Sequence, residues 1–261
     1  MRLFLKTAQS IGKSITNSFA YLVHFFTFFL VTIIRLPALR VGPVRSLLYR
    51  QIYFTGIEAF SKIALIGAFI GVLIVWQVKS IVGSDAVLTG KLLIGTVVNG
   101  IGPLLAAFLV VIRSSAAVAS ELGSMTINKE MESIHIMGIE PLEYLILPRI
   151  VGITISVVML TFYLQIVSIG SGILMFSFML DVSFLKYLKS IISVLSMKAI
   201  VISFIKSFFF GVAISTIACY QGMMVKSSIR EIPRATVATV MQSVFVLFFL
   251  EGLITLSFSQ L

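Results

Sequence analysis

The sequence predicts an all-α integral membrane protein, on the basis of its composition and its run lengths. Of its 261 residues, 59% are hydrophobic and only 11% are charged, whereas a soluble domain has about a quarter charged residues. So little polar surface cannot cover a globule in water, but it suits the hydrocarbon core of a bilayer. Long apolar runs separated by basic segments then predict N-terminal interfacial helices followed by about five transmembrane helices.

The N-terminal part, residues 1–61, is predicted to form amphipathic and elbow helices. Basic residues alternate with apolar ones over residues 1–18, a spacing typical of a helix lying in the membrane interface. The apolar run 20–34 is short for a full span and is followed by several arginines, so an elbow helix fits it better. No small-residue cleavage pattern closes the run, and we expect the segment to be retained.

The remaining residues, 62–261, are predicted to form the transmembrane domain. Its apolar runs are 62–82, 92–112, 150–179, 199–220 and 237–257. In the first run, Gly67 and Gly71 have the small-xxx-small spacing that lets another helix approach closely. The third run is too long for one untilted span, and it forms either one tilted helix or a span with an extension.

The second run contains residues that interrupt a helix, at Gly100, Gly102 and Pro103. We expect a break there, after a turn at residues 84–90. A break frees backbone groups, which is tolerable in a membrane only where protein or a cavity satisfies them.

The loop 113–149 is the longest polar stretch, and it contains an amphipathic helix at 127–137. Its apolar residues recur at spacings of four and three: Ile127, Met131, Ile134 and Met137. Gly138 stops the helix and Pro141 keeps it stopped. Acidic residues dominate the loop and would be repelled by anionic headgroups, which favours docking on a partner protein over lying on the membrane. These residues are Glu121, Glu130, Glu132, Glu140 and Glu143.

The distribution of Lys and Arg predicts the orientation. With five spans, the N-terminal region, the loop 113–149 and the loop 221–236 lie on one side and hold 14 basic residues, against five on the other side. Cytoplasmic loops are enriched in Lys and Arg. We therefore expect a cytoplasmic N-terminus, an external C-terminus and a cytoplasmic 127–137 helix, and we interpret the net charge of +10 as a topology signal rather than nucleic-acid binding.

The sequence offers no catalytic or metal-binding constellation. No Gly-rich phosphate loop is present, so we do not expect this chain to bind ATP itself. The single cysteine, Cys219, cannot form a disulfide framework, and His24 and His135 have no partners at metal-ligand spacing. We expect neither enzymatic activity nor a cofactor.

Two charged residues, Lys206 and Glu251, lie inside the fourth and fifth spans. Each is about 15 residues from the cytoplasmic end of its span, so both lie at a similar depth, roughly 20 Å from that end. A lone charge in lipid is costly, and such charges pair or line a polar cavity. A structural ion pair and a polar spot in a substrate pathway are both compatible with this placement.

Several motifs together resemble the MlaE/YrbE permease family. They are RSSAAVASELGSM at 113–125 with NKEMESI at 128–134, MGIEP at 137–141, LPR at 147–149, GPLLAA at 102–107 and IPRAT at 232–236. The likeness covers about residues 45–258, and the motifs fall in the family's order. One departure is that Asn99 and Gly100 stand where many members have an Arg-Glu pair, and Ile101 replaces a leucine.

This resemblance implies a homodimeric membrane subunit of an ABC transporter that moves phospholipids between membranes. A separate ATPase would dock on the coupling helix 127–137, and an MCE-domain substrate-binding protein would sit on the periplasmic side. The expected coupling residues are Glu121, Gly123, Glu130, Met131, Ile134, Met137, Gly138 and Pro141. The expected membrane is a bacterial inner membrane, or else an organelle inner membrane.

For the lipid pathway the resemblance points to Lys206 and Glu251, and Asn99 is a further candidate as an amide donor to phosphate. A proton-coupled secondary transporter using Glu251 is the alternative, although the expected second broken helix of such a fold is not evident. A purely structural anchor is a third interpretation, and it predicts no polar groups at this depth, contrary to these three residues.

Overall fold

The computed structural model describes residues 27–28, 30–32, 34–82, 86–180, 196–225 and 228–259, and every regular element among them is a helix. Five helical segments in this part are long and apolar enough to cross a membrane. The predicted all-α membrane fold is thus confirmed. The predicted helix at 1–18, much of the run 20–34 and residues 181–195, which join the third and fourth apolar runs, lie outside the described residues.

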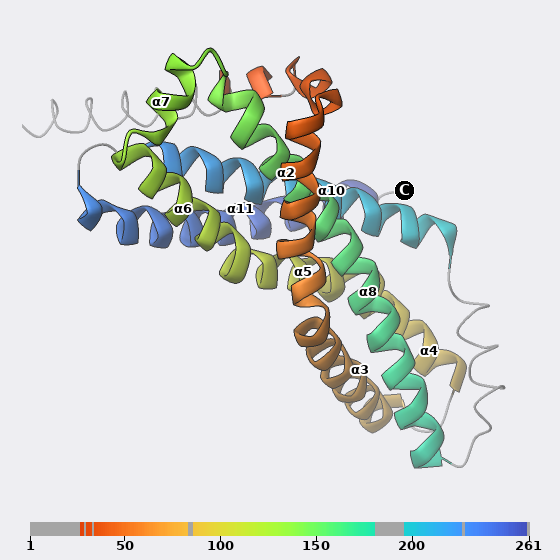
Figure 1. The fold of residues 1–261 in the computed structure, drawn as a ribbon. Coiled ribbons are helices and arrows are strands. Elements are labelled where there is room, and N and C mark those ends of the chain that lie inside the picture. The colour runs from red at the N-terminus through yellow and green to blue at the C-terminus, as the bar shows by residue number, and fades with distance from the viewer. Residues whose placement is uncertain are drawn as a thin grey trace, which may run out of the picture.

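In the first half of the fold, α2 continues into α3, and the long helical segment 86–127 follows (Figure 1). A short 3-10 turn leads into α2, and a second leads into α3. The segment from residue 86 to 127 is continuously helical but changes type along its length. The bounds are η1 Leu36–Arg40, α2 Gly42–Thr55, η2 Ile57–Ala59, α3 Phe60–Val82, α4 Ala86–Ile94, η3 Gly95–Ile101, α5 Gly102–Val110, η4 Val111–Ser115 and α6 Ala116–Ile127.

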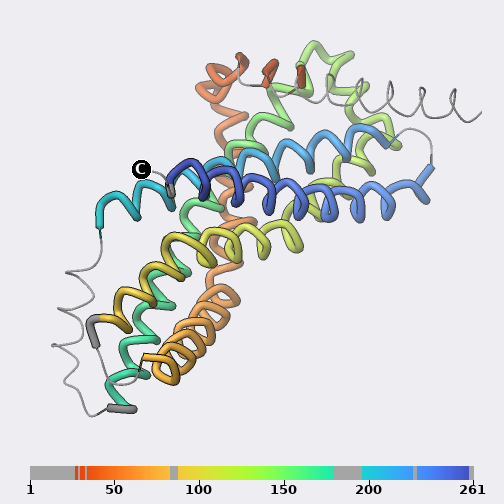
Figure 2. The backbone as a smooth tube through the Cα atoms, turned by 180° about the vertical axis from the view of Figure 1, so that it is seen from behind, coloured from red at the N-terminus to blue at the C-terminus, as the bar shows by residue number. Residues whose placement is uncertain are grey.

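The second half contains the short helix α7 and three long helices. Helix α8 is one continuous helix, so the third apolar run has no separate extension in the described residues. Figures 1 and 2 show α10 and α11 side by side, crossing α8. The bounds are α7 Glu130–Ile136, η5 Leu142–Ile146, α8 Leu147–Leu180, α10 Met197–Met223, η6 Ile229–Glu231 and α11 Ile232–Ser259.

The expected interruption of the second span is present as a change of helix type and not as an end of the helix. The chain is helical from Ala86 onward, so the turn predicted at 84–90 is too long. In place of a break, η3 is a π-helical stretch in which the N–H of Gly102 bonds to the carbonyl of Val97, five residues earlier. Such a bulge lets the helix pass Pro103, which lacks an N–H, without ending.

The helix predicted at 127–137 is shorter than expected. Helix α6 runs on to Ile127, and Lys129 then adopts a left-handed conformation with φ of 58°, which separates α6 from α7. The C-terminal stop is confirmed, since Gly138 has φ of 80°. Only residues 130–136 therefore form the amphipathic helix, and the polar stretch that precedes it is helical rather than a loop.

Helices α3 and α8 approach closely at the two glycines of the first span. A Cβ at Gly67 would lie 3.2 Å from the Leu164 carbonyl, and one at Gly71 would overlap the Ser168 carbonyl. The hydroxyl of Ser168 also donates to the Gly67 carbonyl at 2.8 Å. The small-xxx-small prediction is confirmed, because these glycines allow backbone contact between helices.

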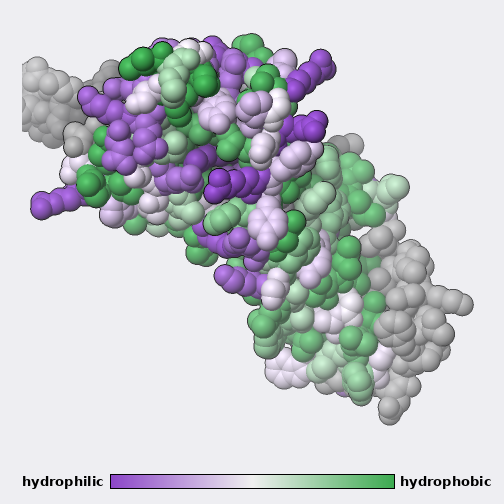
Figure 3. Space-filling model, in the orientation of Figure 1, coloured by the Kyte–Doolittle hydropathy of each residue, from purple (hydrophilic) through white to green (hydrophobic). Residues whose placement is uncertain are grey.

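Ion pairs join distant segments at one end of the molecule. Arg35 pairs with Glu143 at 2.8 Å, Arg113 with Glu58 at 2.5 Å and Arg149 with Glu121 at 2.8 Å. Figure 3 shows hydrophilic residues gathered over the end that carries α7, and apolar residues over the end that carries α3. The hydrophilic residues of the described part thus gather toward the end of the fold that carries α7.

We predict that Gly71→Ala lowers the free energy of unfolding by about 1–3 kcal/mol, because the added methyl group pushes α3 away from the α8 backbone. Thermal unfolding of the purified protein in detergent measures this loss. Gly170→Ala is the matched control, since a Cβ there meets nothing within 4 Å. Equal melting temperatures for the two variants would refute the close contact.

Candidate functional site

A buried lysine lies where α10, α11 and the π-helical stretch η3 meet. Lys206 is 1% exposed, and its ammonium group donates to the Asn99 carbonyl at 2.5 Å, to Glu251 Oε1 at 2.5 Å and to Thr255 Oγ1 at 2.9 Å. A lysine ammonium has three N–H donors. All three are therefore used within the protein.

The helix itself creates the acceptor that Lys206 binds. In an α-helix the Asn99 carbonyl would accept from the N–H of residue 103, but that residue is Pro103, which has none. The neighbouring Val98 carbonyl loses its usual partner too, because the N–H of Gly102 bonds to Val97 instead. Two consecutive carbonyls thus lack the donor that an α-helix would supply four residues on, and both accept from side chains of other helices.

Side chains from α8 and α10 satisfy these carbonyls. The amide nitrogen of Gln165 donates to the Val98 carbonyl at 3.3 Å and to the Ser203 hydroxyl at 2.7 Å, and Lys206 bonds the Asn99 carbonyl. Gln165 and Ser203 are both buried. The π-helical stretch is consequently linked to two other spans by hydrogen bonds that a regular helix would not offer.

Glu251 neutralises Lys206 but is not fully bonded. Its Oε1 accepts from Lys206 and from Thr255 Oγ1 at 3.1 Å, whereas its Oε2 is buried with no hydrogen-bond partner in the described structure. Its side chain is 20% exposed, against 1% for Lys206. The pair therefore joins a wholly enclosed cation to an anion at the edge of the enclosed region.

The sequence analysis placed the two charges together, and the structure confirms that they pair. Asn99 approaches Lys206 through its main-chain carbonyl while the residue itself is exposed, so the role of its side-chain amide stays a prediction. Gln165, Ser203 and Thr255 were missed. Two signals point to them: Gln165 is a long polar side chain within an apolar run, and Thr255 follows Glu251 by four residues on the same helix face.

The expected coupling residues divide between the protein's own core and its surface. Met131 and Ile134 pack against the hydrophobic core. Met137 is 67% exposed, and its neighbour Ile136, which the sequence analysis did not select, is 84% exposed. Because α7 begins three residues later than predicted, the outward apolar face is formed by residues 136–137 rather than by the whole predicted stripe.

The remaining coupling candidates surround this face. Glu130 is exposed and accepts from Asn128 Nδ2 at 3.3 Å, while Gly138 and Pro141 shape the turn after α7. Glu121 and Gly123 lie on α6 instead. Glu121 pairs with Arg149, and a Cβ at Gly123 would lie 3.2 Å from Val225 of the loop after α10.

The part of the chain that the structure describes contains no cluster of the side chains that usually hold a metal ion. No group of three His, Cys, Asp or Glu residues is arranged there to hold an ion. The site consists of one ion pair, neutral polar groups and carbonyls bonded by side chains, an arrangement that can bind and release a polar group.

These features define a polytopic helical membrane protein with a cluster of polar and charged side chains inside its spans and an exposed apolar face at one end. The family model of the permease MlaE matches residues 48–257, and the chain therefore belongs to that family of ABC transporter permeases.

Named relatives agree with this assignment. A probable ABC transporter permease protein of Rickettsia prowazekii is 28% identical over 97% of this chain and 98% of its own length. The intermembrane phospholipid transport system permease protein MlaE of Haemophilus influenzae is 29% identical over 80% of this chain and 81% of its own. The chloroplastic protein TRIGALACTOSYLDIACYLGLYCEROL 1 of Arabidopsis thaliana is 26% identical over 61% of this chain and 46% of its own length.

We predict that Lys206→Met lowers the free energy of unfolding by about 3–5 kcal/mol, because it leaves Glu251 as an unpaired charge. The double variant Lys206→Met/Glu251→Met should lose less than the single variant, since it removes both charges. Thr255→Val is the control for a neutral bond and should cost about 1 kcal/mol. Unfolding of the purified proteins in detergent gives the coupling, and strictly additive losses would contradict the pairing.

Proposed function

We propose that this permease moves phospholipids between membranes, driven by a separate ATPase that docks on α7. The observation that supports it most directly is Lys206, an enclosed cation in a membrane span whose counter-ion is only partly bonded. A phosphate group suits an ammonium ion as a partner. Family membership and the relative named for intermembrane phospholipid transport favour the same cargo.

The bonds of Lys206 determine how a lipid phosphate could bind to it. With all three donors occupied, a lipid phosphate binds Lys206 only if it replaces Glu251, Thr255 or the Asn99 carbonyl. Glu251 and Thr255 lie on the same helix, α11, so movement of α11 away from α10 releases two donors at once. Return of Glu251 then displaces the phosphate. Glu251 in this scheme prevents a permanent complex between cation and lipid.

The ATPase would reach this site through the long second helix. The segment 86–127 contains both the Asn99 carbonyl and α6, and α6 leads into α7. A Cβ at Gly222 of α10 would lie 2.7 Å from the Leu122 Cβ of α6, so these helices are in backbone-close contact. A push on α7 therefore displaces a rigid element that touches α10 and also bears an acceptor of Lys206.

The orientation and the partners follow from the same scheme. Positive-inside counting puts the α7 end in the cytoplasm, with the N-terminus inside and the chain in a bacterial inner membrane or an organelle membrane. Helix α11 has only 17% of its apolar window buried within the protomer. It therefore offers a surface for a second copy, as expected of a homodimer, while an MCE-domain protein would receive lipid on the far side.

The transport proposal is tested by reconstituting the permease with its ATPase in liposomes and following transfer of a labelled phospholipid. We expect ATP-dependent transfer that falls at least about tenfold in the Lys206→Met/Glu251→Met variant, because the phosphate loses its cation. Gly170→Ala is the control, since a methyl group there meets no neighbour. Transfer that persists without the ATPase and follows a proton gradient would instead support the secondary transporter.

We predict that Ile136→Asp lowers binding of the ATPase at least about tenfold, because a charge then enters an apolar contact. Ile136→Leu keeps an apolar side chain and should bind as the wild type does. A pull-down with the purified full-length permease measures both. Ile134 is a poor choice for this test because it packs against the protein's own core. Undiminished binding by Ile136→Asp would exclude docking on this face.

A further inference from the structure

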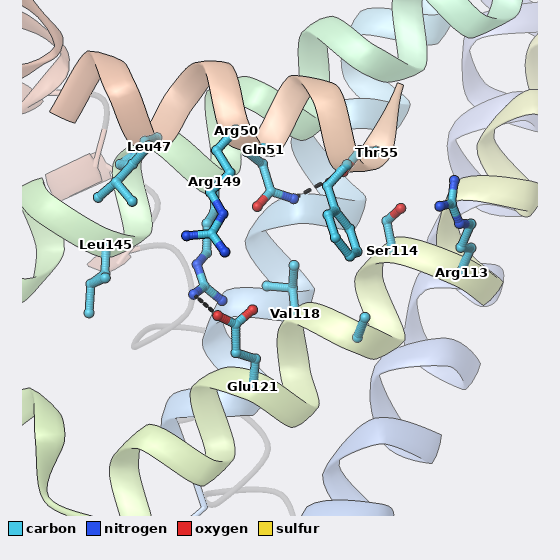
Figure 4. Close-up of a pocket in the computed structure, with 13 residues that line it drawn as sticks. Leu47, Arg50, Gln51, Thr55, Arg113, Ser114, Val118, Glu121, Leu145 and Arg149 are labelled. Carbon is cyan, nitrogen blue, oxygen red and sulfur yellow. Dashed lines mark hydrogen bonds and ion pairs between the residues drawn. The ribbon is translucent and has the colours of Figure 1, made fainter. Parts of the chain in front are cut away.

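A second polar cavity lies between α2, α6 and the start of α8, separate from the Lys206 site. Its volume is about 340 Å³, within the range of small-molecule sites. Figure 4 shows Arg50 of α2 and Arg149 of α8 directing their guanidinium groups into this space, with Arg113 beyond Ser114 at the other end. Three arginines from three separate segments thus line one cavity.

The cavity has an excess of positive charge. Glu121 is the one acidic residue among its lining residues, and it is paired with Arg149 at 2.8 Å. Arg113 is paired with Glu58, which lies outside the lining. Arg50 forms no hydrogen bond or ion pair with any residue that the structure describes. Bringing Arg50 and Arg149 together without a second anion is unfavourable by Coulomb repulsion.

Two of these arginines are not fully bonded by the protein. Arg149 is 9% exposed, and its Nη1 is buried with no hydrogen-bond partner in the described structure. The Nη1 of Arg113 is also buried and unpartnered there. A buried guanidinium nitrogen left without an acceptor costs free energy, so the protein alone does not satisfy this group of cations. Guanidinium groups bind phosphate oxygens in a bidentate manner, so phosphate is the anion that this arrangement fits best.

The position and the remaining lining favour a lipid as the source of that phosphate. The cavity is lined by residues that lie just outside three of the apolar runs, before 62–82, after 92–112 and before 150–179. Leu47, Phe54 and Leu145 supply apolar surface beside the arginines. Basic pockets between membrane helices on the cytoplasmic side bind the headgroups of anionic lipids.

We propose that this cavity is a headgroup site for an anionic phospholipid of the adjacent leaflet, with the phosphate held between Arg50 and Arg149. The bound phosphate accepts from the free Arg50 guanidinium and lies beside the Arg149 guanidinium, while Glu121 keeps its own bond to Arg149. The lipid thereby joins α2 to the start of α8 and to α6, close to the ATPase-docking end. This site does not depend on the cargo or on the Lys206 pathway.

Native mass spectrometry of the full-length protein, incubated with phosphatidylglycerol, tests the proposal. We expect retained phosphatidylglycerol to fall about tenfold in Arg50→Gln, because a charge-assisted phosphate contact is lost. Arg45→Gln is the matched control: it removes the same charge from the same helix, but Arg45 lies over the Tyr49 ring and does not line the cavity. An equal fall in both variants would overturn the proposal.

A variant that binds more lipid than the wild type distinguishes a specific site from loss of binding by misfolding. Glu121→Gln removes the competing carboxylate, so we expect it to retain more phosphatidylglycerol than the wild type, and no increase would count against the site. Diacylglycerol, which lacks phosphate, should not be retained at the cavity. If inorganic phosphate at millimolar concentration displaces the lipid completely, the ligand is free phosphate and the lipid assignment fails.

The Lys206→Met/Glu251→Met variant separates this proposal from the proposed transport function. It should retain phosphatidylglycerol at the wild-type level, because it leaves all three cavity arginines unchanged. Loss of the bound lipid in that variant would show that the lipid occupies the transport pathway, and would overturn the headgroup site. Loss of transport with retained binding would support both.

Discussion

The hydrogen bond from Lys206 to the Asn99 carbonyl determines how the central helices of this permease fit together. Pro103 cannot donate to that carbonyl, and the π-helical stretch before it turns the freed group toward α10. The ammonium group that satisfies the carbonyl is itself a charge inside a membrane span, so it requires Glu251 on α11. The absence of one N–H, at Pro103, thus leads to bonds among three spans. Gln165 of α8 forms a similar bond to the neighbouring Val98 carbonyl.

The spans and the ion pair were predictable from the sequence because they depend on hydropathy and on depth alone. Counting residues from the helix ends placed Lys206 and Glu251 at one level, and a charge at that level has few choices of partner. The π-helical stretches were not predictable, because a proline in an apolar run is compatible with a break, a kink or a bulge. Only the packing of α8 and α10 against Val98 and Asn99 selects the bulge.

The error at α7 has a single local cause. The apolar spacing over 127–137 assumed one helix, but the left-handed Lys129 resets the helical phase, so Met131 and Ile134 turn inward and Ile136 faces out. The arginine cavity illustrates a different limit. Each arginine is visible in the sequence, yet nothing local shows that Arg50, Arg113 and Arg149 face one space, because their segments meet only through tertiary packing.

The fold places its two polar sites at different points along shared elements. Segment 86–127 bears the Asn99 carbonyl at one point and lines the arginine cavity at another, and α8 bears both Gln165 and Arg149. A lipid headgroup bound between Arg50 and Arg149 would therefore favour one relative position of α2, α6 and α8. The two sites nevertheless share no residue, because the groups that bond Lys206 do not line the cavity. A substitution at one site therefore leaves the charged groups of the other in place, so lipid binding at the cavity and transport through the Lys206 pathway can be separated by experiment.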